Sequence, residues 1–459
     1  MSHQDQYARG VRFNSADLFK ALQWLTAGVD WSAIQMRKQS TWTPQWLTWT
    51  AILWAWSNES TLLERFACAQ RLIQHLQSES AKTATSYQAF MKVLIRWTGP
   101  LITTLQVTLR KRMESLSSDD WMRQGFVVFG VDGSKVSLPR TKSNQQAYSH
   151  ARQDSKHNRR KKPNDRAATK KIEQSQVFLT TLFHVGLNLP WDWRTGPADS
   201  SERAHALEML DSLPENALLT GDAGFVGYGF ARTVLESGSQ LLVRVGANVK
   251  LLKKLGYVRE SNGIVYVWTD KAARSEQPPL VFRLVVVQST RHPVYLITSV
   301  TNKSRLSEKQ IADLYRGRWG VEVFFRHLKQ TFGRRQLRSH AAPNAEVELQ
   351  WSLVGLWGIG LYASRELVSQ GVPLQRLSIA QSLKAFRRVA SDYLHPQQKG
   401  QRLNHLLRNA LLDEYKRKDK TSRDFPRKKQ ERPAGKPKIN KATPKQIQTA
   451  QNIKQSKKG

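Results

Sequence analysis

The sequence predicts an α/β protein with a mixed sheet, preceded by a helical N-terminal part. Two apolar runs with β-branched residues, FVVFGVDG from Phe126 and ALLTGDAG from Ala217, indicate strands that are buried on both faces and lead into a carboxylate. Over residues 126–414 such strands alternate with helical stretches. This alternation is typical of a sheet that is covered by helices.

Residues 1–125 show the apolar spacing of helices. Thr43 and Pro44 form an N-cap and first-turn pair. The stretch that they open carries Trp46, Trp49 and Trp56 at helical intervals, which favours a packed core over base stacking as the role of these tryptophans. We expect a helical domain over residues 1–125, with binding of DNA ends as a candidate role.

The α/β part is expected to continue to residue 414 with further strands and helices. A β-rich insertion is expected at about 246–290, because apolar residues alternate there between turn signals. A helix rich in Leu and Trp at 347–367 is expected to cover the sheet. The other predicted elements are strands at 177–185, 217–220, 241–245 and 294–300 and helices at 201–213 and 230–236.

The charge balance indicates a polyanionic partner. The chain holds 72 Lys and Arg against 36 Asp and Glu, a net charge of +36, which is far more than solubility requires. Nucleic acid and an anionic membrane are both candidates. The membrane is disfavoured because the longest apolar run, at 351–363, is shorter than the ~20 residues that a spanning helix needs.

The cysteine count and the N-terminus bear on the compartment. A single Cys68 excludes an internal disulfide framework and a multi-cysteine zinc site. The first residues show no secretory signal pattern. We therefore expect a cytoplasmic protein that associates with the nucleoid.

Two segments concentrate the positive charge. Residues 151–171 contain 9 Lys or Arg and 2 Asp, as expected of a solvated loop or of an arm that contacts phosphates. Residues 415–459 contain 16 Lys or Arg and 3 Asp or Glu, with almost no aromatic residues. We expect this stretch to be a disordered basic tail that attracts phosphate through charge alone.

One helix, predicted over residues 312–332, carries a polar stripe. At ~100° per residue, four side chains fall within roughly 60° of one another: Tyr315, Arg318, Glu322 and Lys329. The opposite side is apolar and is expected to pack on the sheet through Val321, Phe324 and Leu328. Taken alone, Arg318 and Glu322 would also suit an ordinary surface ion pair.

Three carboxylates come into consideration together, Asp132, Asp222 and Glu322. Carboxylates gathered at one place repel one another unless a cation neutralises them. Oxygen ligands without a Cys or His cluster favour Mg²⁺, with Mn²⁺ as a substitute, over zinc. Two such ions would activate a nucleophile and stabilise the leaving oxygen of a phosphodiester, while the cations and the phenol of the stripe hold flanking phosphates.

The intervals between these residues match a known signature. The pattern Tyr-x2-Arg-x3-Glu-x6-Lys at residues 315–329 resembles the third catalytic block of a group of DDE transposases of bacterial insertion sequences. GVDGS at 130–134 resembles the first block, although the family often has Thr where Ser134 stands, and GDAGF at 221–225 resembles the second. LVRVGA at 242–247 is similar to the stretch that follows the second block, and the resemblance covers about residues 126–365.

The resemblance implies a ribonuclease H-like core that is interrupted by a β-rich insertion. It implies that the catalytic metal ligands are Asp132, Asp222 and Glu322. It also implies that the other residues of the signature contact element-end DNA, namely Tyr315, Arg318 and Lys329. It also implies a homodimer that binds terminal inverted repeats, cleaves DNA at the element ends and joins the 3′-hydroxyl to target DNA.

Two further DNA contacts are candidates. Arg326 lies on the same predicted helix. Family members that use a hairpin intermediate hold a flipped base on a Trp in the insertion, and Trp268 is the only Trp in residues 246–290. No spacing supports this assignment, and the sequence favours a packed strand residue as the role of Trp268.

Other functions remain as alternatives. A nuclease of the same fold would cut without joining, and a silent relative would bind DNA without catalysis, although the intact carboxylates argue against it. A carboxylate-pair glycosidase would leave the net charge of +36 unexplained. The motif G-x-x-x-x-G-K-[ST] is absent from the sequence, so no nucleotide cofactor is expected.

Overall fold

The computed structural model describes residues 17–37, 40–76, 86–149, 175–288, 292–394, 402–412 and 435–456. Its strands are β1 (Val127–Ser137), β2 (Gln176–His184), β3 (Leu189–Gly196), β4 (Ala217–Gly221), β5 (Gln240–Val245), β6 (Lys250–Lys253), β7 (Ile264–Val267), β8 (Leu280–Val287), β9 (Val294–Thr298) and β10 (Lys438–Lys441). They form one ten-stranded sheet in the order β10-β6-β7-β8-β9-β5-β4-β1-β2-β3.

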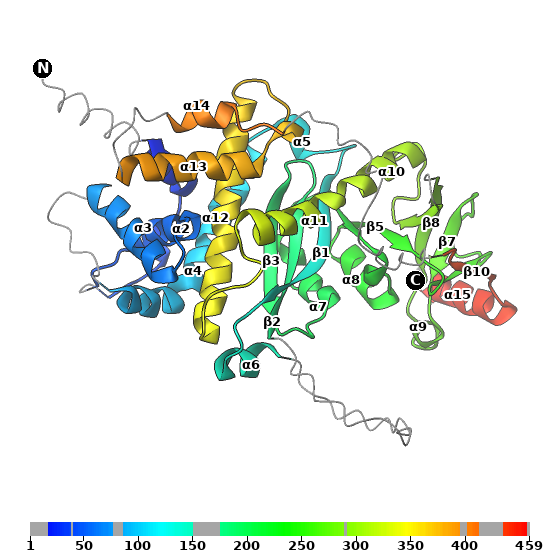
Figure 1. The fold of residues 1–459 in the computed structure, drawn as a ribbon. Coiled ribbons are helices and arrows are strands. Elements are labelled where there is room, and N and C mark those ends of the chain that lie inside the picture. Colours follow the sequence, from blue (N-terminus) through cyan, green and yellow to red (C-terminus); the bar gives the residue numbers. More distant parts are fainter. Residues whose placement is uncertain are drawn as a thin grey trace, which may run out of the picture.

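Helices cover this sheet and form a bundle beside it. They are α2 (Pro44–Trp56), α3 (Leu62–Leu76), α4 (Tyr87–Glu114), α5 (Ser118–Trp121), α6 (Lys142–Tyr148), α7 (Glu202–Leu207), α8 (Tyr228–Glu236), α9 (Asp270–Arg274), α10 (Glu308–Gly317), α11 (Trp319–Arg326), α12 (Ala342–Val368), α13 (Ile379–Leu394), α14 (Leu403–Arg408) and α15 (Pro444–Ser456). Residues 17–26 are also helical. Figure 1 shows the bundle around α12 at one end of the molecule and a lobe with β7, β8 and β10 at the other.

The part of the sheet around β1 mixes strand directions. β1 pairs antiparallel with β2, and β2 pairs antiparallel with β3. β4 lies parallel to both β1 and β5. The predicted α/β architecture with a mixed sheet is confirmed, although β3 is absent from the predicted elements. Because β1 and β4 are parallel neighbours, their C-terminal ends open at the same edge of the sheet.

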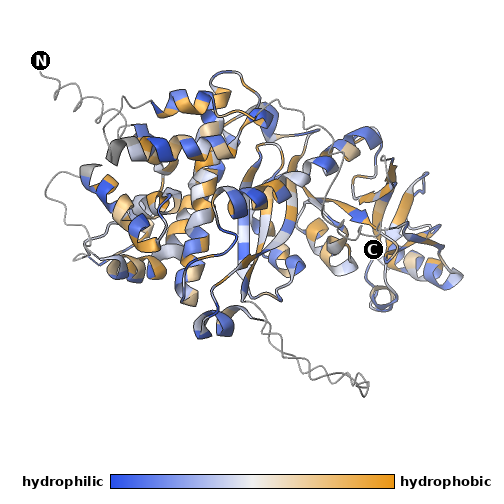
Figure 2. Cartoon of the chain, in the orientation of Figure 1, coloured by the Kyte–Doolittle hydropathy of each residue, from blue (hydrophilic) through white to orange (hydrophobic). Residues whose placement is uncertain are grey.

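α12 forms the centre of the helical part and is buried nearly all round. It packs against α2, α4, α13 and β3, and Figure 2 shows its hydrophobic colouring. Two indole N–H groups fix these contacts: Trp56 donates to the Gly355 carbonyl at 2.9 Å, and Trp351 donates to Thr98 Oγ1 at 2.9 Å. Trp49 is buried as well, so the predicted core role of the α2 tryptophans is confirmed for Trp49 and Trp56.

The helical part is assembled from both ends of the chain. The helices before residue 125 and the helices α12, α13 and α14 contribute to one hydrophobic core. The predicted helical domain over residues 1–125 therefore does not enclose a core of its own. Among the described helices, none has both the length and the apolar content that crossing a membrane requires.

The predicted insertion at 246–290 contains β6, β7, α9 and β8. These strands do not form a sheet of their own, because β8 pairs with β9 and thereby continues the sheet from β5. The antiparallel order of β7, β8 and β9 follows their succession along the chain. The insertion is thus an extension of the central sheet.

The prediction of a disordered tail over residues 415–459 is wrong for its described part. Residues 435–456 form β10 and α15, and β10 pairs parallel with β6 at the edge of the sheet. Ala450 and Ile453 of α15 are buried. The segment has too little apolar surface to fold alone, but the edge strand β6 supplies backbone partners and the lobe supplies apolar contacts. Residues 413–434 and 457–459, like the basic segment 151–171, lie outside the described residues.

Candidate active site

Asp132 and Asp222 lie on neighbouring parallel strands. Asp132 belongs to β1, and Asp222 directly follows β4. The register pairs Gly130 with Thr220, so each aspartate stands two residues beyond the last paired position of its strand. Asp222 then turns the chain, because its Oδ1 accepts the N–H of Gly224 at 2.7 Å. The parallel pairing therefore brings both aspartates to one edge of the sheet.

The predicted continuous helix is broken, so its expected geometry is wrong. α10 and α11 meet at Arg318, and a π-helical turn at 327–331 follows α11. The chain packs closely on β2 and the residue that follows it at this junction: a Cβ on Gly317 would collide with Val185, and a Cβ on Gly320 would come within 2.6 Å of Phe183. The polar stripe therefore does not follow a uniform angle of ~100° per residue. The apolar side of α11 and of the π-helical turn is as predicted, because Val321, Phe324 and Leu328 are buried.

Arg318 links two of the acidic residues. Its Nη2 donates to Glu322 Oε1 at 3.0 Å, and its Nη1 lies 3.8 Å from Asp132 Oδ2. The Arg318 side chain is only 13% exposed. The ordinary surface ion pair that the sequence left open is therefore not what the structure contains. Glu322 is instead linked to Asp132 through the shared guanidinium of Arg318.

The other two signature residues flank this group. Lys329, in the π-helical turn, donates from Nζ to Ser134 Oγ at 2.6 Å and so reaches β1 beyond Asp132. Tyr315 lies on the other side, with its ring 5.7 Å from the guanidinium of Arg318. Burial raises the pKa of the Tyr315 phenol and lowers the pKa of Lys329. The four residues of the signature thus lie around one edge of the sheet despite the break in the helix.

The two remaining candidates differ in accessibility. Arg326, at the end of α11, is exposed and open to a partner. Trp268 follows β7 and is 7% exposed, and its indole N–H donates to the Gln277 carbonyl at 2.8 Å. This packing agrees with the interpretation of Trp268 as a packed strand residue, and its contact with a flipped base stays a prediction.

The electrostatics of Asp132 favour a nearby cation. The pKa of Asp132 is raised to about 6, mainly by burial and to a smaller extent by the carboxylates of Asp222 and Glu322. The N–H of Gly133 and the charge of Arg318 act in the opposite direction. Without positive charge close by, ionised Asp132 would be destabilised in this position.

A fourth carboxylate, Glu202, lies at the same edge and was missed from the sequence. It is the first residue of α7. Its pKa is raised mainly by burial and then by Asp132 and Asp222. The sequence shows only a serine followed by an acidic residue at a helix start, which is ordinary capping. Only the folded sheet brings Glu202 to the aspartates.

The donor set fits a hard divalent cation, because all candidate ligands are carboxylate oxygens. Within the part of the chain that the structure describes, no three His, Cys, Asp or Glu side chains already stand at the spacing of a metal site. The space beside the aspartates also suits a cation, because side chains are missing there at two glycines. An added Cβ on Gly133 would collide with Glu202, and one on Gly224 would lie 2.8 Å from Asp222 Oδ1. Glycine at both positions keeps the carboxylates unobstructed.

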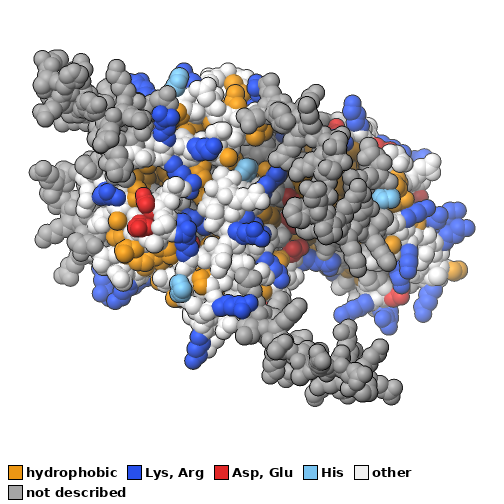
Figure 3. All heavy atoms as spheres, in the orientation of Figure 1, with side chains coloured by type: hydrophobic (Ala, Val, Ile, Leu, Met, Phe, Trp, Pro, Cys, Tyr) orange, Lys and Arg blue, Asp and Glu red, His pale blue; other side chains and the backbone are white. Residues whose placement is uncertain are grey.

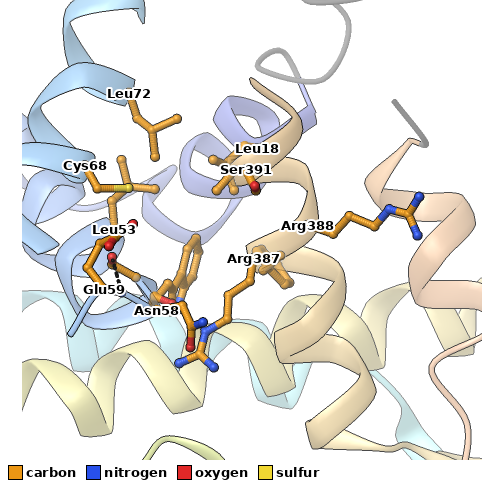
Figure 4. A pocket seen from close by; sticks show the side chains of 13 residues that line it. Leu18, Leu53, Asn58, Glu59, Cys68, Leu72, Arg387, Arg388 and Ser391 are labelled. Carbon is orange, nitrogen blue, oxygen red and sulfur yellow. Dashed lines mark hydrogen bonds between the residues drawn. The ribbon is translucent and has the colours of Figure 1, made fainter. Parts of the chain in front are cut away.

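A cavity of about 330 Å³ lies away from the acidic edge, in the helical part (Figure 4). Its wall is formed by residues of α2, α3 and α13, among them Leu53, Cys68, Leu72 and Arg387. The guanidinium of Arg387 is held by the Trp56 carbonyl at 2.9 Å. None of the predicted site residues lines this cavity, and we assign it no chemistry.

Comparisons with known proteins match the part of the chain that carries these residues. A family model described as a transposase DDE domain matches residues 123–356, which is about half of the chain and includes all three carboxylates. The chain is 27% identical over 199 residues to transposase InsG for insertion sequence element IS4 of Escherichia coli strain K12. That match covers 42% of this chain and 42% of the relative.

One solved structure is similar over most of the chain. It is the cryo-EM structure of the piggyBac transposase synaptic complex with hairpin DNA, with a TM-score of 0.41 and 11% identity. The similarity covers 89% of this chain and 88% of that chain. At this level the likeness carries no conclusion about this fold or its ligands.

Proposed function

This chain belongs to the transposase DDE domain family, and we propose that it is the transposase of a bacterial insertion sequence. It would bind the terminal inverted repeats, cleave DNA at the element ends and join the resulting 3′-hydroxyl to target DNA. The observation that supports this proposal is twofold: the parallel pairing of β1 and β4 brings Asp132 and Asp222 to one edge of the sheet, and Arg318 links Asp132 to Glu322. The partial length of the match to the IS4 relative leaves the activity of the whole chain to experiment.

The sheet supports a ribonuclease H-like core. The strands β3-β2-β1-β4-β5 lie side by side in that order, three of them antiparallel and the last two parallel to β1. This arrangement brings the middle of β1, with Asp132, beside the C-terminal end of β4, with Asp222, and leaves α11 to supply the third acid. Within this proposal, the strands β6 to β8 are an insertion between β5 and β9.

Asp132, Asp222 and Glu322 would hold Mg²⁺, or Mn²⁺ in its place. Such ions supply an activated nucleophile and a stabilised leaving oxygen for phosphodiester exchange. In the cleavage step, water attacks the phosphorus, the bond to the 3′-oxygen breaks, and a 3′-hydroxyl is left on the element end. In the joining step, this hydroxyl attacks a target phosphodiester, a new bond forms, and the target strand is cut.

The cations around the acids would position the DNA. Arg318 can bind a phosphate with two parallel hydrogen bonds, whereas Lys329 acts as a point charge. Tyr315 and the exposed Arg326 would extend the contact along the strand. Figure 3 shows many Lys and Arg side chains and few Asp and Glu side chains on the visible face, as expected for a protein that follows a phosphate backbone. We further propose a homodimer, because an element has two ends to be joined, and action at the nucleoid.

A plasmid assay tests this function. The full chain is incubated in Mg²⁺ with a donor plasmid that carries the inverted repeats flanking its gene and with a second plasmid as target. Joined products, with a short target duplication, are expected. Cleaved ends without joining would favour the ribonuclease H-like nuclease, and binding of the ends without cleavage would favour the catalytically silent relative.

A further inference from the structure

Glu202 stands between the segments that carry the two aspartates. If a Cβ were added to Gly133, which follows Asp132, it would collide with Oε1 of Glu202. A Cβ added to Gly224, two residues after Asp222, would lie 3.8 Å from Oε2 of Glu202. One carboxylate thus occupies space that glycine leaves open beside both aspartates.

The start of α7 is held in place from two sides. Arg203 Nε donates to the Gly224 carbonyl at 2.5 Å, which ties α7 to the loop that follows Asp222. His205 Nδ1 lies 3.0 Å from Thr180 Oγ1 of β2, which ties the same helix to the sheet. The backbone of Glu202 is therefore fixed on both sides, and its side chain has only its own rotamers to sample.

Among the residues that the structure describes, none compensates the charge of the Glu202 carboxylate. It is half-buried, and it makes no hydrogen bond or ion pair with the residues that the structure describes. Arg318 pairs with Asp132 and Glu322 and leaves Glu202 aside. A carboxylate placed next to two others without a cation is unfavourable, so a bound cation would stabilise this arrangement.

We propose that Glu202 is a fourth carboxylate of the active site. Together with Asp132 and Asp222 it would bind a divalent cation. The proposal rests on the proposed function, because it assumes the metal site. Gly133 and Gly224 then serve to admit a carboxylate that any larger residue would displace.

An EPR titration of the full chain with Mn²⁺ tests this inference. Glu202→Gln has the same shape without the charge, and we expect it to weaken Mn²⁺ binding by about tenfold or more. Asp132→Asn should do the same, whereas Glu215→Gln, at an exposed position, should bind like the wild type. The melting temperature without metal, compared across all three variants, verifies that each is folded.

The outcomes separate two failures. Wild-type Mn²⁺ affinity in Glu202→Gln, together with weakened binding in Asp132→Asn, would overturn the role of Glu202 alone. Wild-type affinity in both variants would overturn the proposed metal site as well. A second measurement needs no variant: Fe²⁺ in place of Mn²⁺, with peroxide and ascorbate, cuts the backbone near its ligands. Cuts close to residues 132, 202 and 222 are expected, and their absence near 202 alone would again contradict the proposal.

Discussion

The guanidinium of Arg318 donates to Glu322 Oε1 at 3.0 Å across the junction of α10 and α11. The same group lies 3.8 Å from Asp132 Oδ2. One cation thus compensates two of the acids that we propose as metal ligands. Because opposite charges this close stabilise the ionised carboxylates, Arg318 competes for them with a divalent cation.

Arg318→Ala should therefore bind Mn²⁺ more tightly without DNA, by about tenfold if ~1.4 kcal/mol of the ion pairing is removed. It should bind element-end DNA more weakly, because a paired phosphate contact is lost. EPR titration and gel shift measure the two effects. Arg316→Ala, an exposed cation on α10, is the matched control and should change neither. Unchanged Mn²⁺ affinity in Arg318→Ala would show that the guanidinium does not compete.

Glu322→Gln should keep the binding of DNA ends and lose their cleavage by about a thousandfold or more, because Glu322 is proposed to hold metal and not DNA. Gel shift with end DNA and a cleavage assay in Mg²⁺ give the two values. Glu308→Gln, at the exposed start of α10, serves as control with wild-type cleavage. Retained cleavage in Glu322→Gln would remove Glu322 from the catalytic set.

Lys329→Ala should weaken DNA binding at all sequences alike and reduce the salt slope of log K by about 1, because one phosphate contact is removed. Gel shifts at several salt concentrations measure the slope. Ser134→Ala removes only the partner that holds Lys329 Nζ at 2.6 Å, so it should keep the slope while lowering affinity slightly. An unaltered slope in Lys329→Ala would place Lys329 away from the phosphates.

Ile453→Ala should destabilise the end of the sheet locally. Ile453 is buried where α15 covers the lobe, and truncation of a buried Ile to Ala costs about 2–5 kcal/mol. Hydrogen exchange of the β6 and β10 amides should become faster, while the exchange of β1 and β4 stays unchanged. The control is Gln451→Ala, at an exposed position of the same helix. If the β6 amides exchange as slowly in Ile453→Ala as in the wild type, then α15 does not stabilise this edge of the sheet.

His184 should make the fold sensitive to mild acid. It is fully buried in β2, accepts the Leu187 N–H at Nδ1, and burial lowers its pKa to about 3. The unfolded chain, with an ordinary His pKa of about 6.5, then binds the extra proton first as the pH falls. The free energy of unfolding should drop by about 2 kcal/mol between pH 7 and pH 5 from this residue alone.

Urea unfolding at pH 7 and pH 5 measures this loss. His184→Asn keeps a hydrogen-bond acceptor and does not titrate. Its free energy of unfolding should therefore fall by about 2 kcal/mol less than that of the wild type between pH 7 and pH 5. His340→Asn, an exposed position, should behave like the wild type. An equal pH dependence in His184→Asn and wild type would assign the effect to other groups.

Several parts of the site followed from the sequence for physical reasons that act locally. Apolar runs with β-branched residues favour buried strands, so β1 and β4 and the carboxylates that follow their apolar runs could be predicted. The interval from Arg318 to Glu322 places the two on the same side of a helical path even though that path is interrupted, because the junction at Arg318 keeps near-helical backbone angles.

Other parts required contacts between distant residues. The sequence gives no reason for glycine at Gly317 and Gly320. The structure does, because Val185 and Phe183 leave no room for a Cβ at these positions. The basic tail reads as disordered because its few apolar residues have no visible partner within the segment, yet β6 provides one. The strand β3, LPWDWRTG, carries Pro and Gly and lacks a long apolar run, so only its pairing with β2 defines it.

The sequence by itself determined the acidic strand ends, the signature around Glu322, the excess of positive charge and, with them, the family. Only the tertiary structure decided that Arg318 bridges Asp132 and Glu322, that Trp268 is packed inside and that Glu202 joins the aspartates. The division has a physical reason. Spacing and composition govern what neighbouring residues do, whereas the free energy of a charge depends on groups that the folded sheet brings close from far along the chain.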